Sequence, residues 1–512
     1  MERRRRRFGI LLTAIPAALY ACTPLTDRDW PWHLADFERL AREGIAPWDR
    51  AFWQDRFSYA SEGDFLPVHW VFELALGFAH RAAGLLGVEL VRIALVAAVF
   101  ACLHRRLAKR GLGPVAASAL ALTVAAITRG RLIERPHLVT LLVMVLRWDQ
   151  LLAFREGKTK APWTIIPIFL VWANSHPGVV HGAIFATGFA AAELVRMPRT
   201  RGATLAVCVL GALAATLFTP YGPRLYPYLL EHRSMQSLHH VAELRPFDWR
   251  RLEDFQFLVA LAVAALIVVR GHRSGFKTDP VDLLGTLGFI VLTFVAPREA
   301  NLALIAIAVT IAPVLAETVR EAKGELEDKD RGLHVFAWSF ALVFGFGVPA
   351  WALGSQLWEG ELGTGLRRGF YPVAEANWIL ENRPKGRLWN TNASGGYLIW
   401  RLEPIANPDW KVFTDGRQPL YTRAVNMRFA EIEERFAPNL LVLDPLSPPW
   451  EANAWFEKFQ LVHFSDGGRT YLRRGGPDAT LLAQHGYKHI WFDAADDPRS
   501  VYGKRSRLVV DA

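Results

Sequence analysis

The chain alternates between long apolar runs and short polar loops up to Trp358, and then becomes polar. The apolar runs are roughly 16 to 22 residues long, which lets each cross a hydrocarbon core of about 30 Å as a helix. No stretch after Trp358 is both long and apolar enough to do so. The pattern therefore predicts a mostly α, polytopic membrane helical bundle with a C-terminal soluble α/β domain.

We expect about eleven spans, with the transmembrane domain at residues 1–356 and the soluble domain at residues 357–512. A long first outer loop, residues 26–87, is grouped with the transmembrane domain. The expected spans are Phe8–Leu25, Val88–Leu103, Gly113–Thr128, His137–Phe154, Trp163–Asn174, Val179–Val195, Ala203–Phe218, Phe255–Val269, Val281–Val295, Asn301–Val319 and Val335–Leu353.

Positive charge falls in alternate loops when these spans are counted in order, as the positive-inside rule requires. The formal net charge of +10 is therefore explained by topology, and no nucleic-acid partner is expected. The N-terminus, Arg3 to Arg7 before an apolar run, is interpreted as cytoplasmic and the run as an uncleaved first span. The basic residues assigned to the cytoplasmic side are Arg105, Arg106, Lys109, Arg110, Arg155, Lys158, Lys160, Arg196, Arg199, Arg201, Arg270, Arg273 and Lys277.

Two features refine this topology, the segment Trp70–Leu86 and the residue Trp172. Trp70–Leu86 is apolar but carries Glu73, His80 and Arg81, and counting it as a span would move the Arg105 cluster outside. We therefore expect an amphipathic helix on the outer surface. Trp172, at the outer end of its span, is expected in the interfacial aromatic belt.

The first outer loop is rich in groups that can do chemistry. Asp27, Asp29, His33 and Asp49 lie in it, close to the membrane. A carboxylate there can act as a general base or a metal ligand. The alternative interpretation is that these are solvated loop charges.

Other outer loops interrupt apolar pairs with cationic and polar groups. Arginines outside oppose the positive-inside trend and suggest an anionic ligand, because guanidinium holds phosphate oxygens in a bidentate way. The alternative is a structural ion-pair network, such as Arg298 with Glu299 or Arg131 with Glu134. The candidate binding residues are Arg131, Arg135, His137, Asn174, His176, Tyr221 and Arg298.

The tail reads as short strands alternating with helices, which predicts a small α/β domain. Expected strands are Arg387–Asn390, Lys411–Thr414, Asn439–Leu443 and Leu461–Phe464. The turn from Asn392 to Tyr397 contains two glycines and is interpreted as a tight strand-to-helix turn, with backbone contact to a phosphate as the alternative.

Taken in order, these elements resemble the multispanning C-type glycosyltransferase (GT-C) superfold, which includes oligosaccharyltransferases, protein mannosyltransferases and lipid A aminoarabinose transferases. The likeness departs at Pro31, at Thr219 and at Glu73, which is displaced from His69-Trp70. It rests on the motifs Asp27-Arg28-Asp29-Trp30-Pro31-Trp32-His33-Leu34, Gly44-Ile45-Ala46-Pro47-Trp48-Asp49, Arg135-Pro136-His137, Trp172-Ala173-Asn174-Ser175-His176-Pro177-Gly178, Thr219-Pro220-Tyr221-Gly222, Gly395-Gly396-Tyr397-Leu398 and Asp415-Gly416-Arg417.

The resemblance implies an inverting enzyme of the bacterial inner membrane that takes sugar from a polyprenyl-phosphate donor. The acceptor would be an envelope glycan, lipid or protein. Asp29 or Asp27 would be the base, supported by Asp49. The arginines would neutralise the departing phosphate, and His33 and His176 would bind acceptor or sugar. A divalent metal, Mg or Mn, would be held by Asp29 and Asp49 where one is used.

Two other function classes remain open from the sequence. A lipid-linked glycan transporter or flippase predicts ionisable residues near mid-membrane. The main intramembrane charges, Arg92 and Arg147, lie near span ends or in one short helix, and the other ionisable groups gather at the outer face, which favours a surface site. A catalytically inert scaffold of the same fold is the third class.

Overall fold

The computed structural model describes residues 2–234, 245–273, 275, 278–325, 347–421, 423–445, 457–487, 490–491 and 509–510. Contacts divide the chain into two compact units. The first comprises residues 1–25, 68–229 and 239–365, and the second comprises residues 26–67, 230–238 and 366–512.

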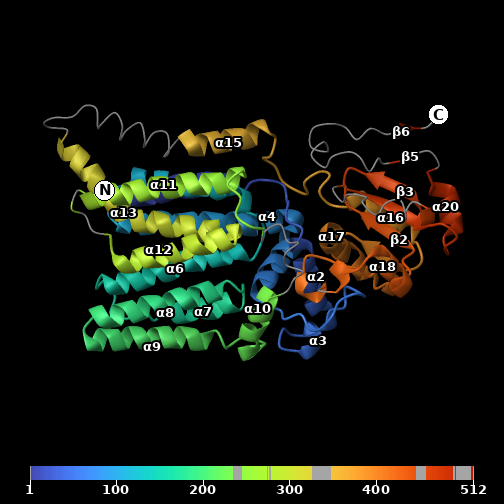
Figure 1. Cartoon of the computed structure of the whole chain (residues 1–512), viewed down its shortest axis with the longest axis horizontal. Helices are drawn as coiled ribbons and strands as arrows, with labels where there is room; N and C mark the ends of the chain where they lie inside the picture. Colours follow the sequence, from blue (N-terminus) through green and yellow to red (C-terminus); the bar gives the residue numbers. More distant parts are fainter. Residues whose placement is uncertain are drawn as a thin grey trace. The chain divides into compact units, whose positions relative to one another are not determined.

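The first unit is a helical bundle in which α8 packs against both α9 and α12 (Figure 1). A helix occupies each of the first ten expected spans, and the eleventh lies partly outside the described residues. The helices between residues 1–25 and 68–365 are α1 (Glu2–Tyr20), α4 (Trp70–Lys109), α5 (Pro114–Thr128), α6 (His137–Arg155), α7 (Ile165–Ala173), α8 (Val179–Arg196), α9 (Arg199–Ala215), α10 (Leu225–Ser234), α11 (Leu252–Arg273), α12 (Pro280–Val295), α13 (Ala300–Glu325) and α15 (Val348–Trp358), with 3-10 turns η1 (Arg129–Arg131), η2 (Gly222–Arg224) and η5 (Pro297–Glu299). The unit boundary falls within α10, after Leu229.

The outward faces of several helices are apolar, as a lipid environment requires. Ile184 on α8, Leu210 on α9, Leu266 on α11 and Leu284 on α12 each expose more than 60% of their surface. Among the described residues, five helices are long and apolar enough to cross a membrane, and two shorter apolar helices accompany them. The bundle thus supplies the helices that a multi-pass membrane protein needs.

The long helix α4 is broken where the sequence analysis separated a surface helix from a span. Ala83 and Gly84 have non-helical backbone angles, and the φ of Gly84 is positive, at 61°. A Cβ on Gly87 would lie 1.9 Å from the carbonyl oxygen of Ala79. Glycine at these positions therefore permits a sharp change of direction between residues 70–82 and 85–109.

Three basic residues assigned to the cytoplasmic side lie at one end of the bundle: Arg110, Arg155 and Arg196. Their shared carboxylate partners, Asp279 and Asp282, show this. Arg155 contacts both Asp282 and Asp279, at 2.9 Å and 3.1 Å. Arg110 also pairs with Asp282, and Arg196 pairs with Asp279 at 3.0 Å. The ends of α4, α6 and α8 and the start of α12 are thus joined by ion pairs.

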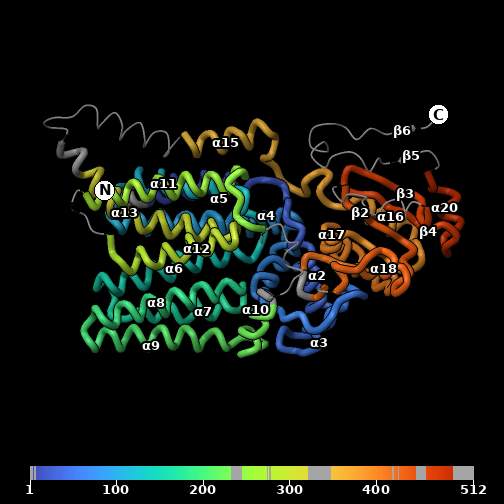
Figure 2. The backbone as a smooth tube through the Cα atoms, in the orientation of Figure 1, coloured from blue at the N-terminus to red at the C-terminus, as the bar shows by residue number. Residues whose placement is uncertain are grey.

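The second unit contains the first loop as well as the C-terminal segments. Although the sequence analysis grouped residues 26–67 with the membrane domain, their contacts are with residues from 366 onward. Figure 2 shows α2 (Trp30–Glu43) beside α17 (Asn392–Leu402). The other elements are α3 (Arg50–Trp53), α16 (Val373–Asn382), β1 (Leu388–Asn390), η7 (Glu403–Ile405), η8 (Pro408–Trp410), η9 (Gln418–Tyr421), η10 (Ala424–Asn426), α18 (Phe429–Phe436), β2 (Leu440–Leu443), β3 (Phe459–Ser465), β4 (Gly468–Arg473), α20 (Ala479–His485), β5 (Ile490–Trp491) and β6 (Val509–Val510).

A mixed four-stranded sheet has the strand order β1-β2-β4-β3, with β1 parallel to β2 and the other pairs antiparallel. Strand β4 was not expected from the sequence. The strand expected at Lys411–Thr414 is wrong: the side chain of Asn390 bonds the backbone of Phe413 and Thr414 at 2.7 and 2.8 Å. An amide side chain thus replaces the neighbouring strand there.

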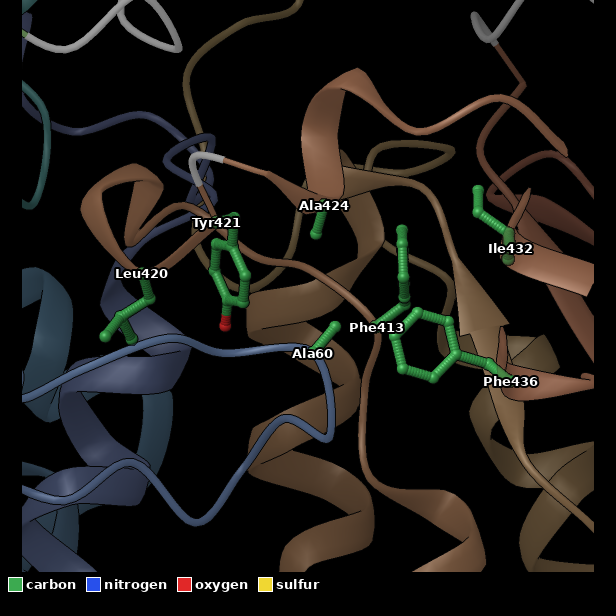
Figure 3. Packing of buried hydrophobic residues seen from close by; sticks show 7 residues of the cluster. All are labelled: Ala60, Phe413, Leu420, Tyr421, Ala424, Ile432 and Phe436. Carbon is green, nitrogen blue, oxygen red and sulfur yellow. The ribbon is translucent and has the colours of Figure 1, made fainter. Parts of the chain in front are cut away.

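The core of the second unit includes a residue of the first loop (Figure 3). Ala60 packs in a cluster with Phe413, Tyr421, Ile432 and Phe436. The hydroxyl of Ser58 donates to the carbonyl of Phe413 at 2.8 Å, and that of Tyr59 to the carbonyl of Leu388 at 2.8 Å. The first loop therefore packs into the core of the second unit and hydrogen-bonds to its backbone.

Candidate active site

The predicted carboxylate Asp29 is the N-cap residue of α2 and is half-buried. The backbone of Gly416 comes so close that a Cβ there would lie 2.0 Å from Asp29 Oδ1. The Asp415-Gly416-Arg417 segment therefore lies directly beside this carboxylate. Glycine is needed at 416 because any side chain would displace the acid.

Asp27 is buried, with 2% of its surface exposed. The hydroxyl of Tyr371 donates to the Asp27 carbonyl at 2.6 Å and accepts from Trp30 Nε1 at 2.9 Å. This fixes the segment that leads into α2. Asp29 has greater access to solvent than Asp27, which makes it the better placed of the two carboxylates for reaction with a substrate.

Two other predicted residues of the first loop have local structural contacts. Asp49 Oδ2 accepts the amide N–H of Ala46 at 2.6 Å, so the Gly44 to Asp49 motif is a turn closed by its own acid. His33 is 2% exposed, and its ring lies 3.6 Å from that of Trp32. Both residues shape the loop around Asp29.

The twin glycines of α17 face protein backbone. A Cβ on Gly395 would lie 2.0 Å from the Thr414 carbonyl oxygen, and one on Gly396 would lie 2.4 Å from that of Arg28. The glycines thus let α17 pack tightly against the first loop and the Asp415 turn. The sequence analysis placed them in a turn before a helix, and this is wrong: α17 begins at Asn392, so both glycines lie inside the helix.

A buried charge network, not recognised from the sequence, underlies this region. Arg417 pairs with Asp55 at 2.8 Å and with Asp415 at 2.7 Å, and all three side chains are at most 2% exposed. The hydroxyl of Tyr421 donates to Asp415. Burial by itself lowers the pKa of Arg417, but Asp415 and Asp55 raise it well above its usual value. The network fixes the Asp415-Gly416-Arg417 turn beside Asp29.

The first unit gathers a second set of predicted residues around His176. His69, His137, His181 and Arg298 are near enough to lower the pKa of His176, and burial lowers it most. The His69 ring lies 5.8 Å from the His176 ring. This cluster is an environment of potential positive charge, which suits an anion.

The predicted arginines have distinct local partners. Arg298 pairs with Glu299 at 3.3 Å, and its side chain is 42% exposed. Glu134 pairs with Arg92 at 2.6 Å. His137 Nε2 donates to the carbonyl of Arg131 at 2.7 Å, which ties the start of α6 to η1. Arg131 and Arg135 are both half-buried on this segment.

Asn174 and Tyr221 use their polar groups inside the fold. Asn174 Nδ2 donates to the carbonyls of Leu170 and Phe218 at 2.8 and 3.0 Å, and its Oδ1 accepts from Trp70 Nε1 at 2.8 Å. The Tyr221 hydroxyl donates to the Ala173 carbonyl at 2.8 Å. These contacts hold together the ends of α7 and α9 and the start of α4.

Trp172 is not in an interfacial belt, contrary to expectation. It is fully buried, and its Nε1 donates to Thr140 Oγ1 at 2.8 Å. A Cβ on Gly182 would lie 2.2 Å from its ring, so glycine provides the space that the indole occupies. Thr140 was not singled out from the sequence, because a threonine within an apolar helix carries no local signal of such a contact.

Within the first unit, His69 and Glu73 offer ligand atoms within 4.8 Å of one another. An imidazole and a carboxylate suit Mn²⁺ or Zn²⁺ better than Mg²⁺, which prefers oxygen ligands. In the second unit, one oxygen of Asp49 is already used by Ala46.

A cavity of about 530 Å³ lies in the second unit, and it includes none of the predicted site residues. Trp378, His463 and His485 are among its lining residues. The rings of Trp378 and His463 are stacked with centroids 6.4 Å apart. The residues predicted from the sequence therefore lie outside this cavity.

The structure is similar to solved membrane glycosyltransferases. The oligosaccharyltransferase of Archaeoglobus fulgidus in the apo form matches 92% of this chain and 75% of its own, with a TM-score of 0.64 and 12% identity. The same enzyme tethered to an acceptor peptide gives a TM-score of 0.60 at 11% identity, over 92% and 74% of the two chains. ArnT from Cupriavidus metallidurans matches 92% of this chain and 98% of its own, with a TM-score of 0.52 and 12% identity.

The chain has the GT-C fold. No protein-family model matches the sequence, and no curated protein matches it. At this level of identity the likeness establishes the fold alone. The GT-C fold accounts for the apolar helical bundle, and the match over 92% of the chain extends beyond that bundle into the second unit.

Proposed function

We propose that the protein transfers a sugar from a polyprenyl-phosphate donor to an envelope glycan, lipid or protein at the outer face of the bacterial cytoplasmic membrane. The N-terminus would be cytoplasmic and the second unit extracytoplasmic. The observation that carries this proposal is the GT-C fold along 92% of the chain. The local chemistry of each unit supports it.

The first unit would bind the phosphate of the donor. The cluster around His176 combines Arg298 with three further histidines. Arg131 and Arg135 add cationic groups on the neighbouring η1 and α6 segment. These positive charges are in place before the reaction and stabilise the phosphate as it leaves with the bonding electron pair. Such electrostatic stabilisation is commonly the largest catalytic contribution.

The second unit would supply the base. Asp29 takes the proton of an acceptor hydroxyl or amine while the acceptor atom forms a bond to the anomeric carbon. The bond from that carbon to the phosphate oxygen breaks, and the phosphate leaves with its electron pair. Attack opposite the leaving group inverts the anomeric configuration. Asp27 and Asp49 hold the loop on which Asp29 is placed.

If the protein uses a divalent metal, Mg or Mn, the ion would add positive charge near the phosphate. His69 and Glu73 are the first-unit side chains suited to it, and Asp29 is the second-unit candidate. The roles proposed for Asp29 and the arginines do not require the metal.

The environments of Arg92 and Arg147 favour a transferase over a transporter. Arg92 is paired with Glu134 and bonds the Thr23 carbonyl. Arg147 lies 4.2 Å from the centre of the Phe185 ring and donates to the Gly182 carbonyl at 3.3 Å. Both side chains are at most 1% exposed. They are buried cross-links of the bundle, whereas a transport path would need ionisable groups that face a cavity.

The test is transfer of radiolabelled sugar from lipid-linked donors by the purified full-length chain. We expect Asp29→Asn to reduce the rate by about 10²- to 10⁴-fold, the usual contribution of a general base. Asp64→Asn is the matched control, because Asp64 lies on the same loop in an exposed pair with Arg50. It should retain native activity.

Equal activity in the native and Asp29→Asn proteins would remove Asp29 from the mechanism. Absence of transfer by the native chain across a panel of donors and acceptors would contradict the enzyme proposal. A transporter or an inert scaffold would then be the better explanation.

A further inference from the structure

His176 is held by a chain of hydrogen bonds that begins at a tryptophan. Trp172 Nε1 donates to Thr140 Oγ1 at 2.8 Å, and Thr140 Oγ1 lies 2.8 Å from His176 Nδ1. An indole N–H is only a donor. The threonine oxygen accepts it, and the threonine hydroxyl hydrogen is available for His176 Nδ1.

A backbone amide determines which ring nitrogen of His176 carries the proton. The N–H of Gly178 donates to His176 Nδ1 at 3.0 Å. Because an amide N–H cannot accept, Nδ1 must present its lone pair. The neutral ring therefore carries its hydrogen on Nε2.

Glycine at 178 is required for this contact. A Cβ there would lie 2.6 Å from Thr140 Oγ1 and 2.7 Å from His176 Nδ1. The arrangement thus explains the spacing of Trp172, His176 and Gly178 in the sequence. Gly178 therefore helps to orient the imidazole of His176.

The contact with Gly178 also requires a neutral ring, because a charged imidazole has no lone pair on Nδ1. Burial lowers the pKa of His176 well below its usual value, and His69, His137, Arg298 and His181 lower it further. A neutral ring with its hydrogen on Nε2 has no lone pair there for a proton or a metal ion. It has one directed N–H donor, on a side chain that is only partly buried.

We propose that His176 donates its Nε2–H to a phosphate oxygen of the lipid-linked donor, and that Thr140 and Gly178 are the positioning residues that fix this donor. The proposal rests on the transferase function above. It assigns His176 to the leaving phosphate, and not to the acceptor, to proton removal or to a metal. A fixed donor gains strength as negative charge develops on the departing oxygen.

Amide substitutions separate these roles. The amide nitrogen of glutamine reaches the position of His176 Nε2, whereas that of asparagine stops near Nδ1. We expect His176→Gln to stay within about threefold of native transfer and His176→Asn to lose about 10²- to 10³-fold, as for removal of one oxyanion donor. If His176→Gln is folded and as inactive as His176→Ala, the ring acts as a base or ligand and the proposal is overturned.

A binding measurement tests the proposal without turnover. Polyprenyl phosphate, without sugar, would be titrated into the full chain in detergent. We expect binding about tenfold weaker in His176→Asn and unchanged in His176→Gln, which is the size of one hydrogen bond to a charged group. Equal binding in all variants overturns the proposal. This binding pattern without any transfer would instead contradict the proposed enzyme function while supporting the phosphate site.

The positioning role has its own readout. Thr140→Val removes the hydroxyl at nearly constant shape, and Thr140→Ser retains it. We expect the valine variant to lower kcat with little change in the acceptor KM, and the serine variant to restore it. Nitrogen-15 NMR of histidine-labelled protein, with His176→Gln to assign the signal, should show hydrogen on Nε2. Hydrogen on Nδ1 would overturn the assignment.

Discussion

The guanidinium of Arg417 lies 2.8 Å from the carboxylate of Asp55, although 362 residues separate them in the chain. Both side chains are buried, and Arg417 also pairs with Asp415. This contact ties the first loop to the C-terminal segments and orients the turn beside Asp29. The base proposed for catalysis thus depends on a pair that is distant in sequence.

Removing one partner of this pair should strongly destabilise the second unit. Arg417→Gln leaves two buried carboxylates without their cation, a change that typically costs about 3 to 5 kcal/mol. Arg368→Gln is the control, because Arg368 is 93% exposed in its pair with Asp466 and should cost less than about 1 kcal/mol. Thermal unfolding of the purified chain measures both. Equal unfolding temperatures would show that the buried network is dispensable.

The same region should make stability depend on pH. Burial raises the pKa of Asp36 to about 7 from 3.8, despite the opposing effects of Arg417 and Arg39. Between pH 4 and 7 the folded state holds this proton and the unfolded state does not. The contribution of Asp36 to stability is therefore lost as pH rises through that window, by at most about 1.4 kcal/mol per pH unit.

Asp36→Asn should remove this contribution. We expect the native unfolding temperature to fall relative to the variant between pH 5 and 7, and the difference to be constant above that. Asp466→Asn, at an exposed position, serves as the control. Parallel pH profiles for the native and Asp36→Asn proteins would contradict a raised pKa at this carboxyl.

Gly416→Ala should impair the site more than it impairs folding. Its Cβ would lie 2.0 Å from Asp29 Oδ1, so the carboxylate or the turn must move. We expect transfer to fall by at least about tenfold, since small displacements of a catalytic group have large effects on rate. Gly188→Ala is the control, because a Cβ there meets nothing within 4 Å. Unchanged transfer in Gly416→Ala would argue that Asp29 need not be held in place.

Asp282 should be essential for the packing of the bundle. It is 3% exposed and is shared by Arg110 and Arg155, so Asp282→Asn leaves two guanidinium groups without their common partner. We expect a loss of about 3 to 5 kcal/mol, measured by thermal unfolding in detergent. Glu317→Gln, in a largely exposed pair with Arg320, should have little effect. Equal losses of stability in Asp282→Asn and Glu317→Gln would mean that Asp282 stabilises the bundle no more than an exposed ion pair does.

The sequence by itself determined the elements whose cause is local. Apolar runs long enough to cross a bilayer placed ten helices, and alternating basic loops predicted which residues share one end of the bundle, where Arg110 and Arg155 now meet Asp282. The order of short motifs indicated the GT-C fold. These signals are readable because hydrophobic length and charge act on each segment separately.

Only the tertiary structure decided which distant groups meet. The first loop joins the C-terminal unit because Asp55 pairs with Arg417 and Ala60 fills a core of later residues. Trp172 donates to the hydroxyl of Thr140, 32 residues earlier in the chain, and His176 Nδ1 contacts the same hydroxyl from 36 residues away. Such contacts depend on shape and on partners far along the chain, which no local pattern encodes.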